Sequence, residues 1–421
     1  MSINVFNSDC LEWLRQQPDN SIDSIVTDPP YGLSNTKPAQ VADVLAAWVT
    51  GDTEAVPAKR GGFMGKDWDS FVPPPAVWEE CMRVLKPGGH MAVFAGARTQ
   101  DLMGLSIRLA GFEIRDTLGW VYGSGMPKSH NISKAIDKAA GAEREVVGTR
   151  DTRKGNGGTG HDFLTESSRS PVVDITAPAT SEAKQWDGWG TALKPAIEPI
   201  ILARKPLDGT VANNVLAHGV GGLNIDACRV GNEVRVNPPG STNPRVAMGD
   251  GWNPDAEPTI ATGRFPANVL LDEVAAAEMD KQSGNVNGVI GMKKVSGGHN
   301  FNVGEHTPQK FNKTSDQVKD SGGASRFFPV FKYQAKAPKR ERPVIEREDG
   351  SKIQHPTVKP VALMEWLVTL ITPPNGVVLD PFAGTGTTLQ AAHNKGFDVI
   401  GVEAEEEYVN LIFKRLTGNE E

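Results

Sequence analysis

The sequence SIVTDPPYG, residues 24–32, decides the fold of this chain. Its β-branched residues Ile25 and Val26 favour a buried strand, and the two prolines that follow cannot continue a sheet ladder. Because proline fixes φ, the turn after the strand is stiff and presents a carboxylate, Asp28, beside an aromatic ring, Tyr31. The stretch therefore predicts a strand that ends in a rigid loop equipped for chemistry.

A second strand, residues 377–380 (VVLD), is followed by the glycine-rich loop PFAGTGTT at residues 381–388. The pattern then predicts a helix that Gly396 ends and a further strand, FDVIGVE, that ends in Glu403. Gly384 and Gly386 let the backbone approach a ligand, and Glu403 follows at the spacing of about twenty residues expected for a ribose-binding acid. This βαβ unit predicts a cofactor site.

Asp28-Pro29-Pro30-Tyr31 resembles the catalytic motif of the amino-methylating DNA methyltransferases, and the 381–388 loop resembles their S-adenosylmethionine loop. The resemblance implies a Rossmann-like α/β fold with a mixed seven-stranded sheet, helices on both faces and the permuted motif order of the β group. In such a sheet the strands before Asp28 and Asp380 are neighbours, and ligands bind beyond their carboxyl ends. A proline turn would explain the first motif alone, but it does not explain both motifs in their strand contexts.

The first motif also fits the chemistry of an exocyclic base amine, which is a poor nucleophile because its lone pair is delocalised into the ring. Asp28 and the carbonyl of Pro29 can accept hydrogen bonds from such an amine. The base must leave the duplex, at a cost of roughly a few kcal/mol, and Tyr31 can stack on it. The implied reaction is direct transfer from the sulfonium, without a covalent enzyme intermediate and without a metal.

Two further segments complete the cofactor site by resemblance. Asp9 and Cys10 match the family's contact to the cofactor adenine, although a role as helix N-cap would also explain Asp9. Residues 355–360, HPTVKP, resemble the family's H-P-T-x-K-P segment at the methionine end, where Lys359 and the next helix N-terminus can hold a carboxylate. The predicted cofactor-binding residues are Asp9, Cys10, Asp28, His355, Thr357, Lys359, Asp380, Phe382, Ala383, Gly384, Gly386, Thr387 and Glu403.

Composition and motif order predict five segments: a catalytic half (1–125), a mobile polar insertion (126–190), the last, antiparallel sheet strand (191–206), a target-recognition region (207–346) and a cofactor-binding half (347–421). Glu198 stands at the start of the apolar run that forms the antiparallel strand. Trp186 and Trp189 could be wedges into DNA, but we expect them in the core. In the recognition region, Lys336, Lys339 and Arg340 are predicted to contact DNA phosphates, with a solvated surface cluster as the alternative.

The composition limits the class of protein. The chain has 421 residues with 38% hydrophobic content, and no stretch is long and apolar enough to span a bilayer or to form a signal peptide, so we expect a cytoplasmic protein. Its three cysteines lack CxxC pairing, which argues against a disulfide framework or a zinc site. A net charge of −7 does not exclude DNA as a partner, because the local charge of one face decides binding.

The resemblance implies a DNA methyltransferase similar to those of phages and prophages, acting on double-stranded DNA in a restriction–modification context, with a homodimer left open. An acid at position 28, where cytosine-N4 enzymes commonly have serine, favours adenine N6 as the target. The alternatives are cytosine N4, protein glutamine methylation, which uses Asn at this position, and a non-catalytic DNA-binding regulator. The intact Asp28, Tyr31 and Gly384 argue against the regulator.

Overall fold

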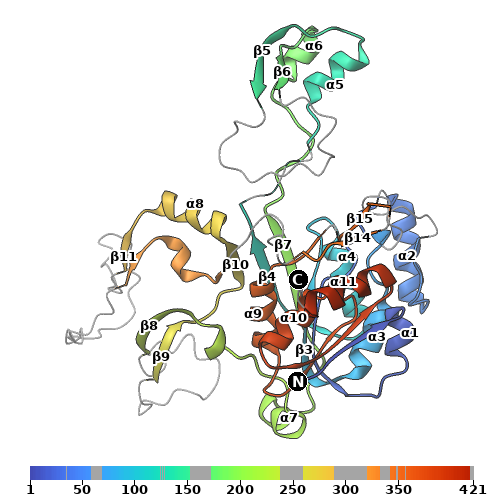
Figure 1. Ribbon diagram of the computed structural model, residues 1–421, viewed down its shortest axis with the longest axis vertical. Helices are drawn as coiled ribbons and strands as arrows, with labels where there is room; N and C mark the ends of the chain where they lie inside the picture. The colour runs from blue at the N-terminus through green and yellow to red at the C-terminus, as the bar shows by residue number, and fades with distance from the viewer. Residues whose placement is uncertain are drawn as a thin grey trace, which may run out of the picture.

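The computed structural model describes residues 1–417 except 35, 58–68, 124, 126, 128, 152–171, 238–258, 289–319, 332–341, 348 and 356. Figure 1 shows a central sheet with helices on both sides, a small module (α5, α6, β5, β6) that projects from it, and a lateral lobe with α8, β8, β9 and β11.

The central sheet contains nine of the described strands, with a single antiparallel member. That member is β7, and an antiparallel strand was predicted for the apolar run that begins beside Glu198. It lies between β3 and β4. The spatial order is β1 (Ile3–Asn7), β17 (Asp398–Glu403), β16 (Val377–Asp380), β2 (Ile22–Thr27), β3 (Leu85–Phe94), β7 (Ile197–Arg204), β4 (Glu113–Val121), β10 (Val269–Asp272) and β13 (Val330–Phe331).

The prediction of seven strands is corrected by β10 and β13, which come from the 207–346 segment. β10 pairs in parallel with β4, and β13 pairs in parallel with β10. Without them β4 would present a row of unpaired backbone groups at the edge of the sheet. The first seven strands keep the predicted permuted order, with β16 and β2 as parallel neighbours in the middle.

Two hydrophobic cores cover the two faces of the sheet. Strand β2 is buried along its whole length, and its alternation sends Ile25 into one core and Val26 into the other. This burial on both faces explains why the consecutive residues Ile25 and Val26 are both apolar. The first core is covered by α1 (Cys10–Leu14), α2 (Pro38–Thr50), α3 (Pro75–Val84) and α4 (Gln100–Leu109), and the second by α9 (Val361–Ile371), α10 (Thr387–Asn394) and α11 (Glu406–Thr417).

The described residues of the 126–190 insertion, which the sequence predicted to be mobile, contain helices and strands that form the projecting module. It contains α5 (Ile132–Ala139), the antiparallel pair β5 (Val146–Asp151) and β6 (Val172–Thr176), and α6 (Ser181–Gln185). Its centre is the buried carboxylate of Asp137, which accepts hydrogen bonds from the backbone of Ala179 and Thr180 at 3.0 Å and pairs with Arg144 at 2.5 Å. Polar contacts thus link α5 to the residues before α6 in a segment whose composition resembles that of a loop.

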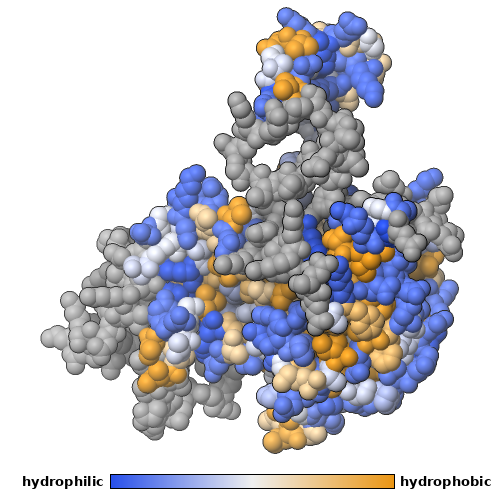
Figure 2. Space-filling model, viewed as in Figure 1, coloured by the Kyte–Doolittle hydropathy of each residue, from blue (hydrophilic) through white to orange (hydrophobic). Residues whose placement is uncertain are grey.

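The surface of this module also corrects the expectation that Trp186 and Trp189 lie in the core. The two side chains are 38% and 58% exposed and pack edge to face with ring centroids 5.0 Å apart. Val146 and Val147 of β5 are exposed as well, and Figure 2 shows apolar side chains at the β5 end of an otherwise hydrophilic module.

The lateral lobe lies beyond β4 and carries most of the described recognition segment (Figure 1). Its elements are β8 (Val230–Asn237), β9 (Thr259–Arg264), α8 (Glu273–Ser283), β11 (Val286–Gly288) and β12 (Asp320–Gly322). The helix α7 (Val211–His218), from the same segment, packs against β3 and not on the lobe. A short ribbon of β14 (Ile345–Glu346) and β15 (Lys352–Ile353) leads back to the sheet. No helix in the described ranges is long and apolar enough to cross a bilayer.

Candidate active site

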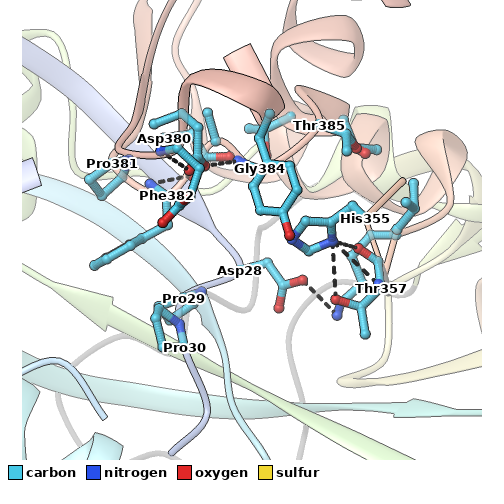
Figure 3. A pocket seen from close by; sticks show the side chains of 18 of the residues that line it. Asp28, Pro29, Pro30, His355, Thr357, Asp380, Pro381, Phe382, Gly384 and Thr385 are labelled. Atoms are coloured by element: carbon cyan, nitrogen blue, oxygen red, sulfur yellow. Dashed lines mark hydrogen bonds and ion pairs between the residues drawn. The ribbon is translucent and has the colours of Figure 1, made fainter. Parts of the chain in front are cut away.

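A cavity of about 570 Å³ opens at the carboxyl ends of β2 and β16, where both predicted motifs meet. Figure 3 shows Asp28 between the loop residues Asp380, Phe382 and Gly384 and the pair His355 and Thr357. The predicted residues that line the cavity are Asp9, Cys10, Asp28, Pro29, Pro30, Tyr31, His355, Thr357, Lys359, Asp380, Phe382, Ala383, Gly384, Thr387 and Glu403.

The Asp28 carboxylate is held by one contact to each oxygen. Oδ1 accepts a hydrogen bond from the Tyr31 hydroxyl at 2.7 Å, and Oδ2 lies 2.8 Å from the ammonium of Lys359. Burial raises the pKa of Tyr31 well above its usual value, and the carboxylates of Asp28 and Glu198 raise it further, so the hydroxyl keeps its proton. The loop therefore presents the Asp28 carboxylate in a fixed orientation as an acceptor of hydrogen bonds.

The backbone of the same loop is fixed by a buried acid and a threonine. Asp69 is 4% exposed and accepts hydrogen bonds from the amides of Tyr31 and Gly32 at 2.7 and 2.9 Å. The Thr99 hydroxyl donates to the carbonyl of Tyr31 at 2.6 Å. Asp69 follows the polar segment after the first motif, and nothing in its sequence context marks it as a partner of that motif.

Asp380 ends β16 and links it to the catalytic strand. Its Oδ1 accepts hydrogen bonds from the Thr27 hydroxyl at 2.6 Å and from the amide of Phe382 at 3.1 Å. Burial raises the pKa of Asp380 to about 6, although these hydrogen bonds act to lower it. The carboxyl group thus joins the ends of the two central strands.

Glu403, at the end of β17, contacts the glycine loop directly. Its carboxylate accepts hydrogen bonds from the amides of Gly384 at 2.8 Å and Glu405 at 2.9 Å. Burial raises the pKa of Glu403 to about 7, although both hydrogen bonds favour the ionised form. Gly384 has φ +53°, and a Cβ there would meet only the His355 ring, at 3.8 Å, so the backbone is open to the cavity.

At the other side of the cavity, Asp9 does serve as the N-cap of α1, with its carboxylate accepting from the amides of Leu11 and Glu12 at 2.9 and 3.1 Å. Burial, together with the charge of Asp9, raises the pKa of Cys10 to about 12, so the thiol is neutral. Both residues also line the cavity. The cap role and the predicted cofactor contact are therefore compatible.

A family model for DNA methylases that act on N6 or N4 amines matches residues 22–151 and 247–414, well over half of the chain. The chain belongs to this DNA methylase family. The type II methyltransferase M.HindIII of Haemophilus influenzae is 22% identical to the methylase over 433 residues, which cover 98% of this chain and 94% of the relative. M.HinfI of Haemophilus influenzae is 44% identical over 72 residues, 17% of this chain and 20% of the relative.

Similar solved structures include DNA methyltransferases at low identity. The methylase has 14% identity and a TM-score of 0.43 to the cytosine-N4-specific PvuII DNA methyltransferase, covering 100% of this chain and 88% of that chain. For the M1.HpyAVI–SAM complex the identity is 15% and the TM-score 0.40, covering 99% and 100%.

Lys359 of the methylase does not lie free at the N-terminus of α9, where the sequence predicted an anion contact. Its ammonium lies 2.8 Å from Asp28, 3.2 Å from Glu198 Oε2 and 3.0 Å from the Tyr31 hydroxyl. Glu198, the second residue of β7, was noted in the sequence but not counted as a site residue. Tyr122, at the end of β4, also lines the cavity without having been predicted.

Gly386, which was also predicted to bind the cofactor, is not among the described residues that line the cavity. Gly386 has φ +76° and precedes α10, and a Cβ there would lie 2.9 Å from Ile412, so it lets the loop pack on α11. Lys336, Lys339 and Arg340 lie outside the described residues. The last described residue before them is Phe331, which ends β13. This strand runs parallel to β10, and β10 runs parallel to β4. The described residues hold no cluster of three or more His, Cys, Asp or Glu arranged for a metal.

Proposed function

We propose that the methylase transfers a methyl group from S-adenosylmethionine to N6 of adenine in double-stranded DNA, after the base has been flipped out of the duplex. One observation carries the proposal. Asp28, from the first half of the chain, shares a cavity with the glycine loop and Glu403, from the last part. A carboxylate that can accept hydrogen bonds from an amine thus lies beside a loop that can hold a nucleotide-like cofactor.

The residues of the cavity fit S-adenosylmethionine. Seven carboxyl groups and one lysine are found among its described lining residues, which complements a cofactor with a sulfonium charge. The open backbone at Gly384 allows close approach, and Glu403 offers its carboxylate to ribose hydroxyls. Asp9, Cys10, Asp380, Phe382, Ala383 and Thr387 would hold the adenosine part, and His355 and Thr357 the methionine part. The bound cofactor supplies an electrophilic methyl group.

The residues of the catalytic loop fit an amine as the methyl acceptor. Asp28 retains lone pairs on both oxygens beside its contacts to Tyr31 and Lys359, and with the Pro29 carbonyl it can accept from a flipped base amine. These hydrogen bonds turn the nitrogen lone pair toward the methyl donor. The Tyr31 ring offers a stacking surface for the base. An acid at position 28, rather than serine, is the reason to prefer adenine N6 over cytosine N4.

A labelling experiment tests the substrate and the atom. Full-length protein is incubated with S-adenosylmethionine carrying a labelled methyl group and, in parallel, with unmethylated DNA, RNA and protein. We expect label in DNA alone and, after digestion to nucleosides, in N6-methyladenine. Label in N4-methylcytosine would establish the second candidate, label in protein would indicate glutamine methylation, and no label would favour a DNA-binding regulator.

A further inference from the structure

Lys359 belongs to a buried charge cluster whose side chains come from three separate parts of the chain. Its side chain is 9% exposed, and its ammonium lies within 3.2 Å of oxygens of Asp28, Glu198 and Tyr31. These partners follow β2 and lie within β7, whereas Lys359 itself precedes α9. The ammonium also lies over the rings of Phe94 and Tyr31, 4.8 and 5.3 Å from their centroids.

The charge state of the cluster follows from its partners. Burial acts to lower the pKa of Lys359, but the carboxylates of Asp28 and Glu198 outweigh it and raise the pKa, so the lysine is protonated. The ammonium donates a hydrogen bond to the Tyr31 hydroxyl, and carboxylate oxygens of Asp28 and Glu198 lie at ion-pair distances of 2.8 and 3.2 Å, so three oxygens already surround it. A cofactor carboxylate would have to displace one of them.

We propose that Lys359 is a positioning residue for methyl transfer: it fixes the Asp28 carboxylate and the Tyr31 hydroxyl for the target amine, and Glu198 holds Lys359 in place. This inference rests on the proposed role of Asp28. It assigns Lys359 to the acceptor side of the reaction and not to the cofactor carboxylate.

The position of Glu198 has an electrostatic reason. An unaccompanied ammonium at this place would repel the positive sulfonium that the same cavity must bind. With Glu198 and Asp28 on either side of it, the cluster carries a net negative charge. Lys359 can therefore orient Asp28 without disfavouring the methyl donor.

The test separates a role of Lys359 in positioning Asp28 from a role in binding the cofactor carboxylate. It does so by comparing a cofactor that has this carboxylate with one that lacks it. Affinities of wild type and Lys359→Gln are measured by calorimetry for S-adenosylmethionine and for its decarboxylated analogue, and kcat for DNA methylation is measured at saturating cofactor. We expect kcat to fall roughly hundredfold, as for a misplaced catalytic group. The ratio of the two affinities should remain that of wild type.

Two more variants keep the test decisive if Lys359→Gln folds poorly. Lys359→Arg retains a cation, and its guanidinium can pair with the carboxylates. Its kcat should therefore be at least about a tenth of the wild-type value. Glu198→Gln keeps the shape of the side chain and should lower kcat roughly tenfold through looser positioning, with little change in cofactor affinity.

Lys86→Gln is the matched control, because Lys86 pairs with a buried acid, Asp23, at 2.6 Å near the opposite end of β2. It should lower the melting temperature and leave kcat unchanged below that temperature. A wild-type rate in Lys359→Gln, or loss of its preference for the carboxylated ligand, would overturn the inference. If wild type itself does not methylate DNA, or Asp28→Ala is fully active, the proposed function fails instead.

Discussion

Glu403 is the residue whose ionisation near neutrality has a direct consequence for the cofactor. Burial, then the nearby charges of Asp380 and Glu405, act against ionisation and place its pKa at about 7. The ionised carboxylate accepts more hydrogen bonds from ribose hydroxyls than the protonated one does. Cofactor affinity should therefore increase as the pH rises through about 7.

We predict that wild type binds S-adenosylmethionine roughly tenfold more weakly at pH 6 than at pH 8, because about a tenth of Glu403 is ionised one unit below its pKa. Glu403→Gln should bind more weakly than wild type at pH 8 and show little dependence on pH. Calorimetry across this range provides the measurement. The same pH dependence in the glutamine variant would assign the titration to another acid, such as Asp380, whose pKa is about 6.

At the scale of elements, the glycine loop between β16 and α10 combines backbone shape with access. Gly384 and Gly396 both have positive φ, +53° and +85°, but only Gly384 faces the cavity. Substitution at either position costs about 1–3 kcal/mol of stability, because a side chain there is strained in the left-handed region.

Gly384→Val should accordingly weaken cofactor binding by about tenfold or more, which corresponds to about 1.4 kcal/mol of lost binding free energy. Gly396→Val, which ends α10 away from the cavity, should lose similar stability and keep wild-type affinity. Thermal melts and calorimetry measure the two effects separately. Equal affinities in both variants would mean that the loop does not approach the cofactor.

The projecting module has a buried acid, Asp137, that contacts its other segments. Hydrogen bonds from Ala179, Thr180 and Arg144 outweigh burial and lower the pKa of Asp137 to about 2. Its stabilising effect is therefore present above the unfolded pKa of about 4 and is lost only as the pH falls through about 2.

Asp137→Ala should make α5, β5, β6 and α6 sensitive to limited proteolysis at neutral pH, because Arg144 and the two amides lose their acceptor. The central sheet and cofactor binding should be preserved. Asp174→Ala, in the exposed part of β6, is a suitable control with no expected change. A protease-resistant Asp137→Ala module would show that other contacts order it.

At the scale of the whole molecule, DNA affinity depends on the distribution of positive charge beyond the cavity. We predict that replacing Lys336, Lys339 and Arg340 together by Ala lowers the salt dependence of DNA binding. Each lost phosphate contact reduces the slope of log affinity against log salt by about 0.9, so three contacts reduce it by nearly three. The methylated sequence should stay the same, since phosphate contacts do not read bases. An unaltered slope would place these residues away from DNA.

The sequence predicted those parts of the molecule in which a local pattern and a motif coincide. The neighbouring positions of β2 and β16 and the shared cavity followed from two strands that end in recognisable loops and from the family resemblance of those loops. The antiparallel β7 followed from its apolar run and the same resemblance. Strands β10 and β13 were not predictable, because four and two residues form them and pairing at the sheet edge stabilises them. The partners of Lys359 were also hidden, since they come from segments far apart in the chain and meet only in the folded protein.

The most direct test of the account compares wild type with Asp28→Ala in DNA methylation and in cofactor binding. Asp43→Ala, an exposed acid on α2, is the control. General acid–base and positioning contacts of this kind contribute about 10²–10⁴-fold, so Asp28→Ala should lose at least a hundredfold in methyl transfer. Its cofactor affinity should fall only modestly, because Lys359 keeps Glu198 as its partner. Turnover of Asp28→Ala within tenfold of wild type would contradict the central claim that Asp28 acts on the target amine.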